Sequence, residues 1–74
     1  MSDRAPGGAL VANIEVSAAT VQRGDIIQLG GRAYRVRDLF QRPQGAKQLL
    51  FESGELLTIH TRTRLVAVRM LRGR

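Results

Sequence analysis

From residue 23 onward, apolar and polar residues alternate in short runs that are separated by glycine-rich or polar breaks. A period of two places successive side chains on opposite faces, which is typical of β-strands with one buried face. The pattern predicts five strands, which span Ile26–Leu29, Ala33–Phe40, Lys47–Glu52, Leu56–His60 and Leu65–Met70. Several short strands at this spacing favour a small barrel.

The breaks between the runs carry residues that suit turns. Gly30 and Gly31 tolerate positive φ, as a tight hairpin requires. Residues 42–46 form a loop around a proline and a glycine. Ser53-Gly54 predicts a further hairpin, and the short polar segment 61–64 predicts one 3₁₀ turn before the last strand.

The alternation also assigns faces within two strands. In the second strand, one face holds Tyr34, Val36 and Phe40, and the other holds Arg35, Arg37 and Leu39. Asp38 falls on the apolar face, so the sequence predicts a bulge or sharp bend at this point. In the last strand, one face holds Val66, Val68 and Met70, and the opposite face, with Arg69 directed outward, holds Leu65, Ala67 and Arg69.

These elements predict one domain. Residues 9–71 are expected to form an all-β, five-stranded SH3-like barrel with a short 3₁₀ turn before the last strand, and residues 9–22 an extra strand or lead-in segment. Residues 1–8, rich in glycine and proline, are expected to be a disordered tail, and 72–74 a basic tail. The alternative is a small open antiparallel sheet that is completed by dimerisation through Leu10–Val16. Because closure removes exposed strand edges, we favour the barrel.

The first half of the chain resembles a known family. The segment 23–27 reads Arg-Gly-Asp-Ile-Ile and is followed by Gly31, Tyr34, Val36, Pro43 and Gly45. Over residues 23–50 this order resembles the N-terminal barrel of elongation factor P and related KOW-type translation domains. The resemblance implies an SH3-like fold and contact with nucleic acid or the ribosome.

One departure from that family bears on function. The family's loop presents a modified basic residue at its tip, whereas the tip here reads Gln44-Gly45-Ala46 and Lys47 begins the next strand. The function of the modified residue is therefore not carried over to this chain. The chain also resembles small actinobacterial proteins, in keeping with its arginine content.

The composition excludes several classes of chemistry. The 74 residues include no cysteine and one histidine, which rules out disulfides, thiolate nucleophiles and the usual zinc ligand sets. No carboxylate pair and no Ser–His–Asp spacing supports catalysis. We therefore expect no enzyme activity, no metal and no cofactor. No apolar run approaches the roughly 20 residues of a membrane span, and no signal peptide is visible, so we expect a cytoplasmic protein that does not bind membranes.

The positive charge is concentrated in one part of the chain. The formal net charge is +6, residues 1–24 are neutral, and residues 25–74 carry the whole excess. A basic surface attracts polyanions, so we expect nucleic acid or an acidic protein surface as the partner. A second copy of the chain is a further expected partner, through the strand pattern of residues 9–16. All but one of the twelve basic residues are arginine, which also fits the codon bias of a GC-rich genome.

A set of basic residues is the strongest candidate binding site. In a five-stranded barrel, one stripe is expected to contain Arg35, Arg37, Lys47, Arg62, Arg64 and Arg69. The planar guanidinium fork makes two parallel hydrogen bonds to a phosphate. Because few aromatic residues are available for base stacking, the contacts should go mainly to phosphates and carry little sequence information.

Two other functions fit the same fold. A protein-interaction module would use an apolar patch rimmed by arginine and made of Leu39, Phe40, Leu56 and Leu65. An accessory subunit whose partner completes an enzyme site is the third reading. Fold class does not choose among these functions.

Overall fold

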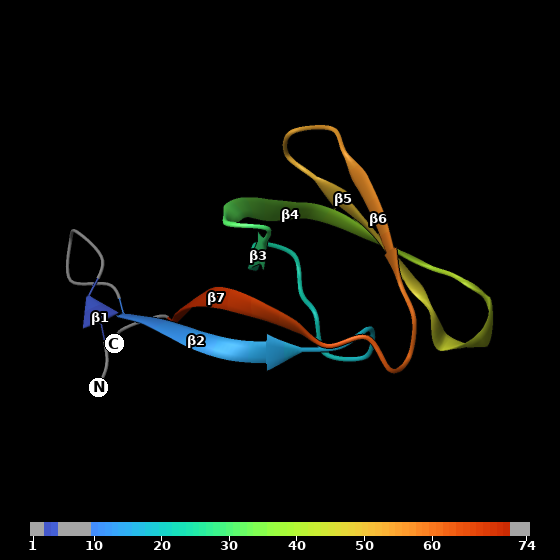
Figure 1. The fold of residues 1–74 in the computed structure, drawn as a ribbon, viewed down its shortest axis with the longest axis horizontal. Helices are drawn as coiled ribbons and strands as arrows, with labels where there is room; N and C mark the ends of the chain where they lie inside the picture. The colour runs from blue at the N-terminus through green and yellow to red at the C-terminus, as the bar shows by residue number, and fades with distance from the viewer. Residues whose placement is uncertain (1–2, 5–9, 72–74) are drawn as a thin grey trace.

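The computed structural model describes residues 3–4 and 10–71, which form strands joined by turns and one 3₁₀ turn (Figure 1). The strands are β1 (Asp3–Arg4), β2 (Leu10–Val16), β3 (Ile26–Leu29), β4 (Arg32–Gln41), β5 (Lys47–Phe51), β6 (Leu56–Ile59) and β7 (Leu65–Leu71), and the 3₁₀ turn is η1 (Pro43–Gly45). The all-β prediction is confirmed. Apart from β1, the predicted tails at 1–8 and 72–74 lie outside the described residues.

All pairs in the sheet are antiparallel, and the strand order is β1-β2-β7-β3-β4-β5-β6. The sheet bends sharply along β4, so that β2 and β7 run side by side away from β5 and β6 (Figure 1). The predicted barrel closure is not found among the described strands. Closure of β6 onto β7 would need a free edge of β7, but β2 and β3 occupy both of its edges.

The segment 9–22, expected to be a strand or a lead-in, supplies both. Its strand β2 pairs with β7 at seven consecutive positions without a register shift. Residues 17–20 then form a turn, in which Ser17 C=O accepts from the N–H groups of Thr20 and Val21 at 3.1 and 3.0 Å. This turn leads the chain from the outer strand across β7 to β3.

The core lies on the concave side of the bent sheet. Its buried members come from every strand between β2 and β7 and from the β2–β3 connection, and they are Val16, Ala18, Val21, Ile27, Val36, Leu49, Phe51, Ile59 and Ala67. The rings of Tyr34 and Phe51 pack at a centroid distance of 5.2 Å. A core this small is expected to supply only about 3–5 kcal/mol of stability.

The predicted bulge in the second strand is confirmed. The pairing of β4 with β5 shifts register between Val36 and Asp38, which inserts Arg37 as an extra residue. The insertion reverses the faces of the residues that follow. Leu39 therefore packs against the core and Phe40 is 41% exposed, so the predicted faces of these two residues were wrong.

The predicted faces of the last strand also need correction. Ala67 is fully buried and Leu65 packs against the core, whereas Val66 and Met70 are 54% and 53% exposed. Arg69 shares the core side with Ala67 and is not directed outward. Both faces of this strand are apolar in sequence, so the alternation alone did not identify the buried one.

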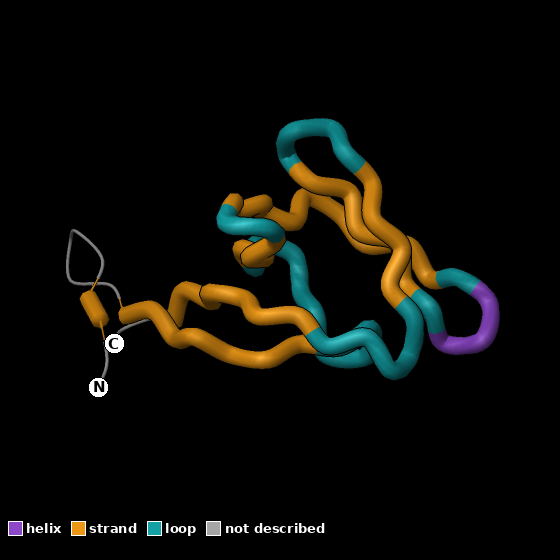
Figure 2. The backbone as a smooth tube through the Cα atoms, viewed as in Figure 1, coloured by secondary structure: helices purple, strands orange, loops and turns teal. Residues whose placement is uncertain are grey.

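The 3₁₀ turn lies elsewhere than predicted. It is η1, in the loop between β4 and β5 (Figure 2). Residues 60–63 instead form a turn in which the Thr63 N–H donates to His60 C=O at 3.0 Å and the Thr63 hydroxyl accepts from the His60 N–H at 3.2 Å. One backbone bond of this kind closes a single turn, and the Thr63 hydroxyl satisfies the His60 N–H, which has no partner within the turn.

Two leucine substitutions test which side of the sheet forms the core. Leu49 is fully buried and Leu56 is 58% exposed. Leu49→Ala should destabilise the fold by about 2–5 kcal/mol, which approaches the whole stability expected of this chain. Leu56→Ala should change the free energy of unfolding by about 0.5 kcal/mol or less. Urea unfolding followed by circular dichroism measures both, and similar losses in the two variants would contradict the assignment.

Candidate nucleic-acid interface

The outer face of β4, β5 and β6 carries an aromatic ring beside polar groups. The inner face of these strands is marked by buried Leu49 and Ile59, so the alternate positions point outward. Phe40 pairs with Gln48, which in turn pairs with Thr58, and these three form one row across the outer face. Phe40 is 41% exposed, so a ligand in solution can contact its ring.

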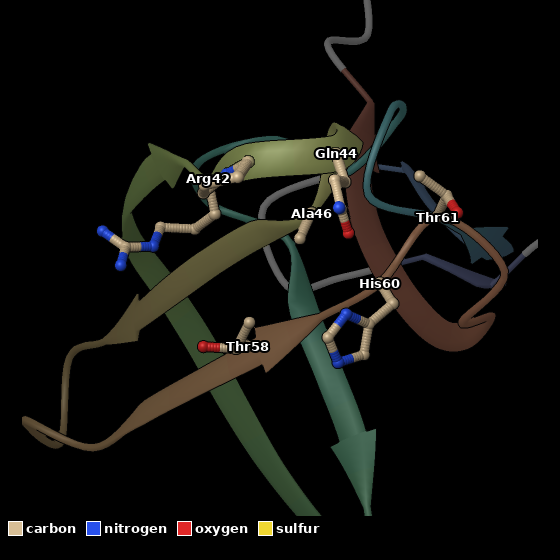
Figure 3. A pocket seen from close by; sticks show the side chains of 7 residues that line it. Arg42, Gln44, Ala46, Thr58, His60 and Thr61 are labelled. Carbon is tan, nitrogen blue, oxygen red and sulfur yellow. The ribbon is translucent and has the colours of Figure 1, made fainter.

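A hollow of about 330 Å³ lies at the end of this face, next to that row. Its lining comes from the β4–β5 loop, from β6 and from the turn after β6, and consists of Arg42, Pro43, Gln44, Ala46, Thr58, His60 and Thr61. Arg42 and His60 lie to either side of Ala46 and Thr58 (Figure 3). The lining contains two nitrogen-rich side chains and two hydroxyls, but no carboxylate.

The loop that builds this hollow is held in an unusual conformation. Gln44 is the one non-glycine residue with positive φ among the described residues (φ 61°, ψ 31°), and Gly45 follows at φ 77°. The Arg42 N–H donates to Ala46 C=O at 2.9 Å, and the Ala46 N–H donates to Pro43 C=O at 3.2 Å. Residues held in the left-handed region cost free energy and often mark functional sites.

Gly45 is required by its neighbour as well as by its φ. A Cβ at this position would lie 2.7 Å from Cγ2 of Thr61, a distance that real Cβ atoms do not tolerate. The absence of a side chain therefore brings the loop and the turn after β6 into contact. Both neighbours of this contact, Gln44 and Thr61, line the hollow.

A second hollow of about 330 Å³ gathers three arginines at the start of β3. Its lining is Gln22, Arg23, Gly24, Asp25, Arg35, Arg69 and Met70. Each arginine already faces an acid: Arg23 Nε lies 3.2 Å from Asp38, Arg35 Nε lies 3.8 Å from Glu52, and Arg69 lies 2.8 Å from Asp25. The positive charge of this hollow is therefore largely balanced from within the chain.

Of the four ion pairs among the described residues, Asp25–Arg69 is the least exposed: the Asp25 side chain is buried and the Arg69 side chain is 26% exposed. Arg69 Nε and Nη2 donate to the two carboxylate oxygens of Asp25, each at 2.8 Å, and Nη2 also donates to Thr20 C=O at 3.1 Å. The Gln22 N–H donates to the same carboxylate at 2.9 Å. Burial acts to raise the pKa of Asp25, but the hydrogen bonds from Arg69 and Gln22 and the charge of Arg69 outweigh it, so the pKa is lowered. The same bond raises the pKa of Arg69.

The six residues predicted as one basic stripe lie in several places. The structure brings together Arg35 and Arg69, both at the second hollow. Arg64 precedes β7 and pairs with Glu15 of β2 at 3.4 Å. It is five residues from Arg69, which corresponds to about 17 Å along a strand.

The other three predicted residues have no ion-pair partner among the described residues. Arg37 is the exposed bulge residue of β4. Lys47 begins β5 opposite Ile59 and so lies on the core side of that strand, half-buried. Arg62 is exposed in the turn after β6, next to Thr61 of the first hollow.

Sequence reasoning did not select Arg42, which lines the first hollow. The strand register held part of the signal: Phe40, Gln48 and Thr58 form one row on the outer face, and Arg42 and His60 lie two residues beyond Phe40 and Thr58. The predicted apolar patch is divided in the structure, since Leu39 and Leu65 pack on the core while Phe40 and Leu56 are exposed. The outer position of Phe40 could be predicted only if Arg37 was counted as an extra residue in the bulge.

Comparison of the chain with family models, with curated proteins and with solved structures found no match in any of the three. The resemblance to the elongation factor P barrel therefore stays a prediction. Within residues 3–4 and 10–71, no three His, Cys, Asp or Glu side chains are placed to hold a metal ion. The same part of the chain contains no helix long and apolar enough to cross a membrane.

Removal of Arg69 tests the Asp25–Arg69 ion pair. Arg69→Ala leaves the Asp25 carboxylate without its charged partner and should cost about 1–3 kcal/mol of stability, since Asp25 keeps the bond from the Gln22 N–H. Because the folded-state pKa of Asp25 is lowered, its stabilising contribution is present above about pH 4 and is lost as the pH falls through the folded pKa. The difference in the free energy of unfolding between wild type and Arg69→Ala should therefore become smaller as the pH is lowered from 7 to 3.

Urea unfolding at several pH values measures this gap. Asp25→Asn/Arg69→Ala is the control, since it removes the buried charge together with its partner and should recover part of the loss. If Arg69→Ala is already unfolded at pH 7, partial refolding at pH 4 would support the same conclusion, because protonation removes the unpaired charge of Asp25. A gap that is independent of pH would show that the pair does not stabilise the fold through its charge.

Gly45 and Thr61 form a second testable contact. Gly45→Ala should destabilise the fold by about 1–2 kcal/mol from the left-handed backbone alone, with an added cost from the clash with the Thr61 methyl group. Thr61→Ser removes that methyl group, so the double variant should lose less than the sum of the single losses. Thermal unfolding of the four proteins gives the coupling, and strict additivity would contradict the contact.

Proposed function

We propose that the chain is a non-enzymatic module that binds nucleic acid through its phosphates, and that the outer face of β4–β6 is the contact surface. One observation carries the proposal. Exposed Phe40 lies in the row next to a hollow that contains Arg42 and His60 and no acid. Elsewhere in the described chain, Arg23, Arg35, Arg64 and Arg69 are each paired with a carboxylate.

The fold proposed for this module is a partly open SH3-like barrel made of β3–β7. Four consecutive strands pair in the order β3-β4-β5-β6, and β7 returns to lie beside β3. This arrangement, together with the resemblance in residues 23–50, supports the assignment. The further strand β2 lies outside that five-stranded unit.

The chemistry of the surface suits a phosphate with an attached base. The guanidinium fork of Arg42 offers parallel donors to phosphate oxygens, and the hydroxyls of Thr58 and Thr61 offer further donors. The exposed face of Phe40 offers one stacking surface, which tolerates any base. Binding of this kind has little sequence preference, because phosphate contacts position a ligand without reading its sequence.

The remaining cations extend the positive field around this surface. Arg37, Arg42, Lys47 and Arg62 have no ion-pair partner among the described residues. A net charge of +6 on 74 residues steers polyanions toward the molecule from a distance. Each neutralised phosphate releases counterions, so the affinity must fall with salt.

A protein partner is the second candidate, and one observation favours it. Leu50 pairs with Leu56 in the row beside that of Phe40, and Leu56 is 58% exposed. Phe40, Leu50 and Leu56 therefore form a small apolar patch next to the basic hollow. An acidic peptide with an apolar residue would suit both parts, and its binding would depend more on the patch than on salt.

Charge reversal of Arg42 tests the proposed function. Labelled duplex DNA and single-stranded RNA are titrated at 50 and 200 mM salt and followed by fluorescence anisotropy. Neutralisation of three phosphates gives a log–log slope near −2.7 for the duplex, which is a loss of roughly 40-fold between these salts. Arg42→Glu should lower the magnitude of the slope by about one and weaken binding about tenfold at 0.1 M salt.

Arg32→Glu is the matched control. It makes the same change in net charge at an exposed position at the opposite end of β4 from Arg42, so it should weaken binding much less. If the two variants lose the same affinity, the loss comes from the change in net charge and not from a contact made by Arg42. If Arg35→Glu/Arg37→Glu loses affinity and Arg42→Glu does not, the nucleic acid binds near the second hollow, which Arg35 lines. No binding at 50 mM salt, with loss of a protein partner in Leu56→Ala, would favour the second candidate.

A further inference from the structure

The outer edge of β2 is open over most of its length. β1 pairs with β2 only at Leu10 and Val11, and no described strand pairs with the edge of Ala12–Val16 that faces away from β7. In an antiparallel ladder, alternate residues direct their N–H and C=O groups to each neighbour. Half of the backbone groups in this stretch therefore face outward, where none of the described strands pairs with them.

This edge lacks most of the features by which proteins protect an exposed strand. Such edges are usually short, bulged, or carry proline or lysine. β2 has seven residues that pair with β7 without a register shift, and Ala12–Val16 contains no proline and no lysine. The opposite edge of the sheet, β6, has only four residues. Protection at β2 is therefore expected to come from a partner strand.

The charges of this region favour a copy of the same strand as the partner. Residues 10–22 contain one charged side chain, Glu15, which Arg64 offsets at 3.4 Å. The positive excess, which would repel a second copy, is carried by residues 25–74. Two copies that meet through β2 bring together strands that each carry a single, already offset charge.

We propose that two copies of the chain pair antiparallel through their β2 edges, with a two-fold axis at Ile14. This register uses only the open stretch and places Ala12 opposite Val16, Asn13 opposite Glu15, and Ile14 opposite Ile14 of the other copy. The Asn13 amide donates to the Glu15 carboxylate twice, once on each side of the axis. Pairing of identical edges closes as a dimer and leaves no β2 edge exposed.

The interface would be small, so the association should be weak. A ladder of five residues buries less than a standard interface, and we expect a dissociation constant in the range of about 10–1000 µM. It does not involve the outer face of β4–β6. This inference is thus independent of the proposed nucleic-acid function.

Substitutions of exposed Asn13 test the register by sedimentation equilibrium from 10 µM to 1 mM protein. The wild type should approach twice the 8.2 kDa mass of a single chain. Asn13→Asp places like charges opposite each other twice and should raise the dimer dissociation constant about tenfold, whereas Asn13→Lys faces Glu15 and should lower it severalfold. A general charge effect has the opposite sign, because the aspartate variant has the lower net charge.

Cysteine cross-linking gives a second readout, since the chain has no cysteine of its own. Ile14→Cys meets its own copy at the axis, within the Cα separation that a disulfide spans, and should form covalent dimers under mild oxidation. Glu15→Cys faces residue 13 of the other copy and should cross-link far less. A monomer at 1 mM, growth beyond dimers, tighter association of Asn13→Asp than of Asn13→Lys, or equal cross-linking of the two cysteine variants would each overturn the proposal.

Discussion

The guanidinium of Arg69 connects three segments that are distant in sequence. It donates to the carboxylate of Asp25 at the start of β3 and to the carbonyl of Thr20 in the β2–β3 connection, while its own backbone belongs to β7. Asp25 in turn accepts from the Gln22 N–H. Since β7 lies between β2 and β3, this one side chain fixes how the chain crosses from one side of β7 to the other. Beyond β3, the sheet continues through β4, β5 and β6.

The position of β7 explains why the sheet is open. β2 and β3 occupy both of its edges, so β6 has no edge of β7 on which to close. The open sheet ends in strands of unlike character. At one end, the β2 segment is nearly uncharged and presents backbone groups. At the other, the outer face of β4–β6 presents Phe40, Arg42 and His60 beside an acid-free hollow.

The local signals in the sequence predicted the strands and turns well, because they depend on short-range physics. All five strands, the Gly30-Gly31 hairpin with positive φ at both residues, and the bulge beside Asp38 were predicted correctly. The faces beyond the bulge were predicted wrongly, since one inserted residue reverses every later assignment. In β7 both alternating sets are apolar, so only the pairing partners decide that Ala67 is buried and Val66 is exposed. Closure failed for a non-local reason, the insertion of β2.

Charge in the sequence predicts a polyanionic partner but could not divide the arginines by role. Six acids are available to twelve basic residues, and which pairs form depends on contacts between strands distant in sequence. Arg69 was predicted to point outward, yet its Nε and Nη2 donate to Asp25, which lies 44 residues away in the sequence. Arg42 was not selected from the sequence because it lies in a loop, yet it lines the same hollow as His60. An arginine without a carboxylate partner keeps all of its donors for a ligand, so the proposed basic site lies where the described acids leave arginines unpaired.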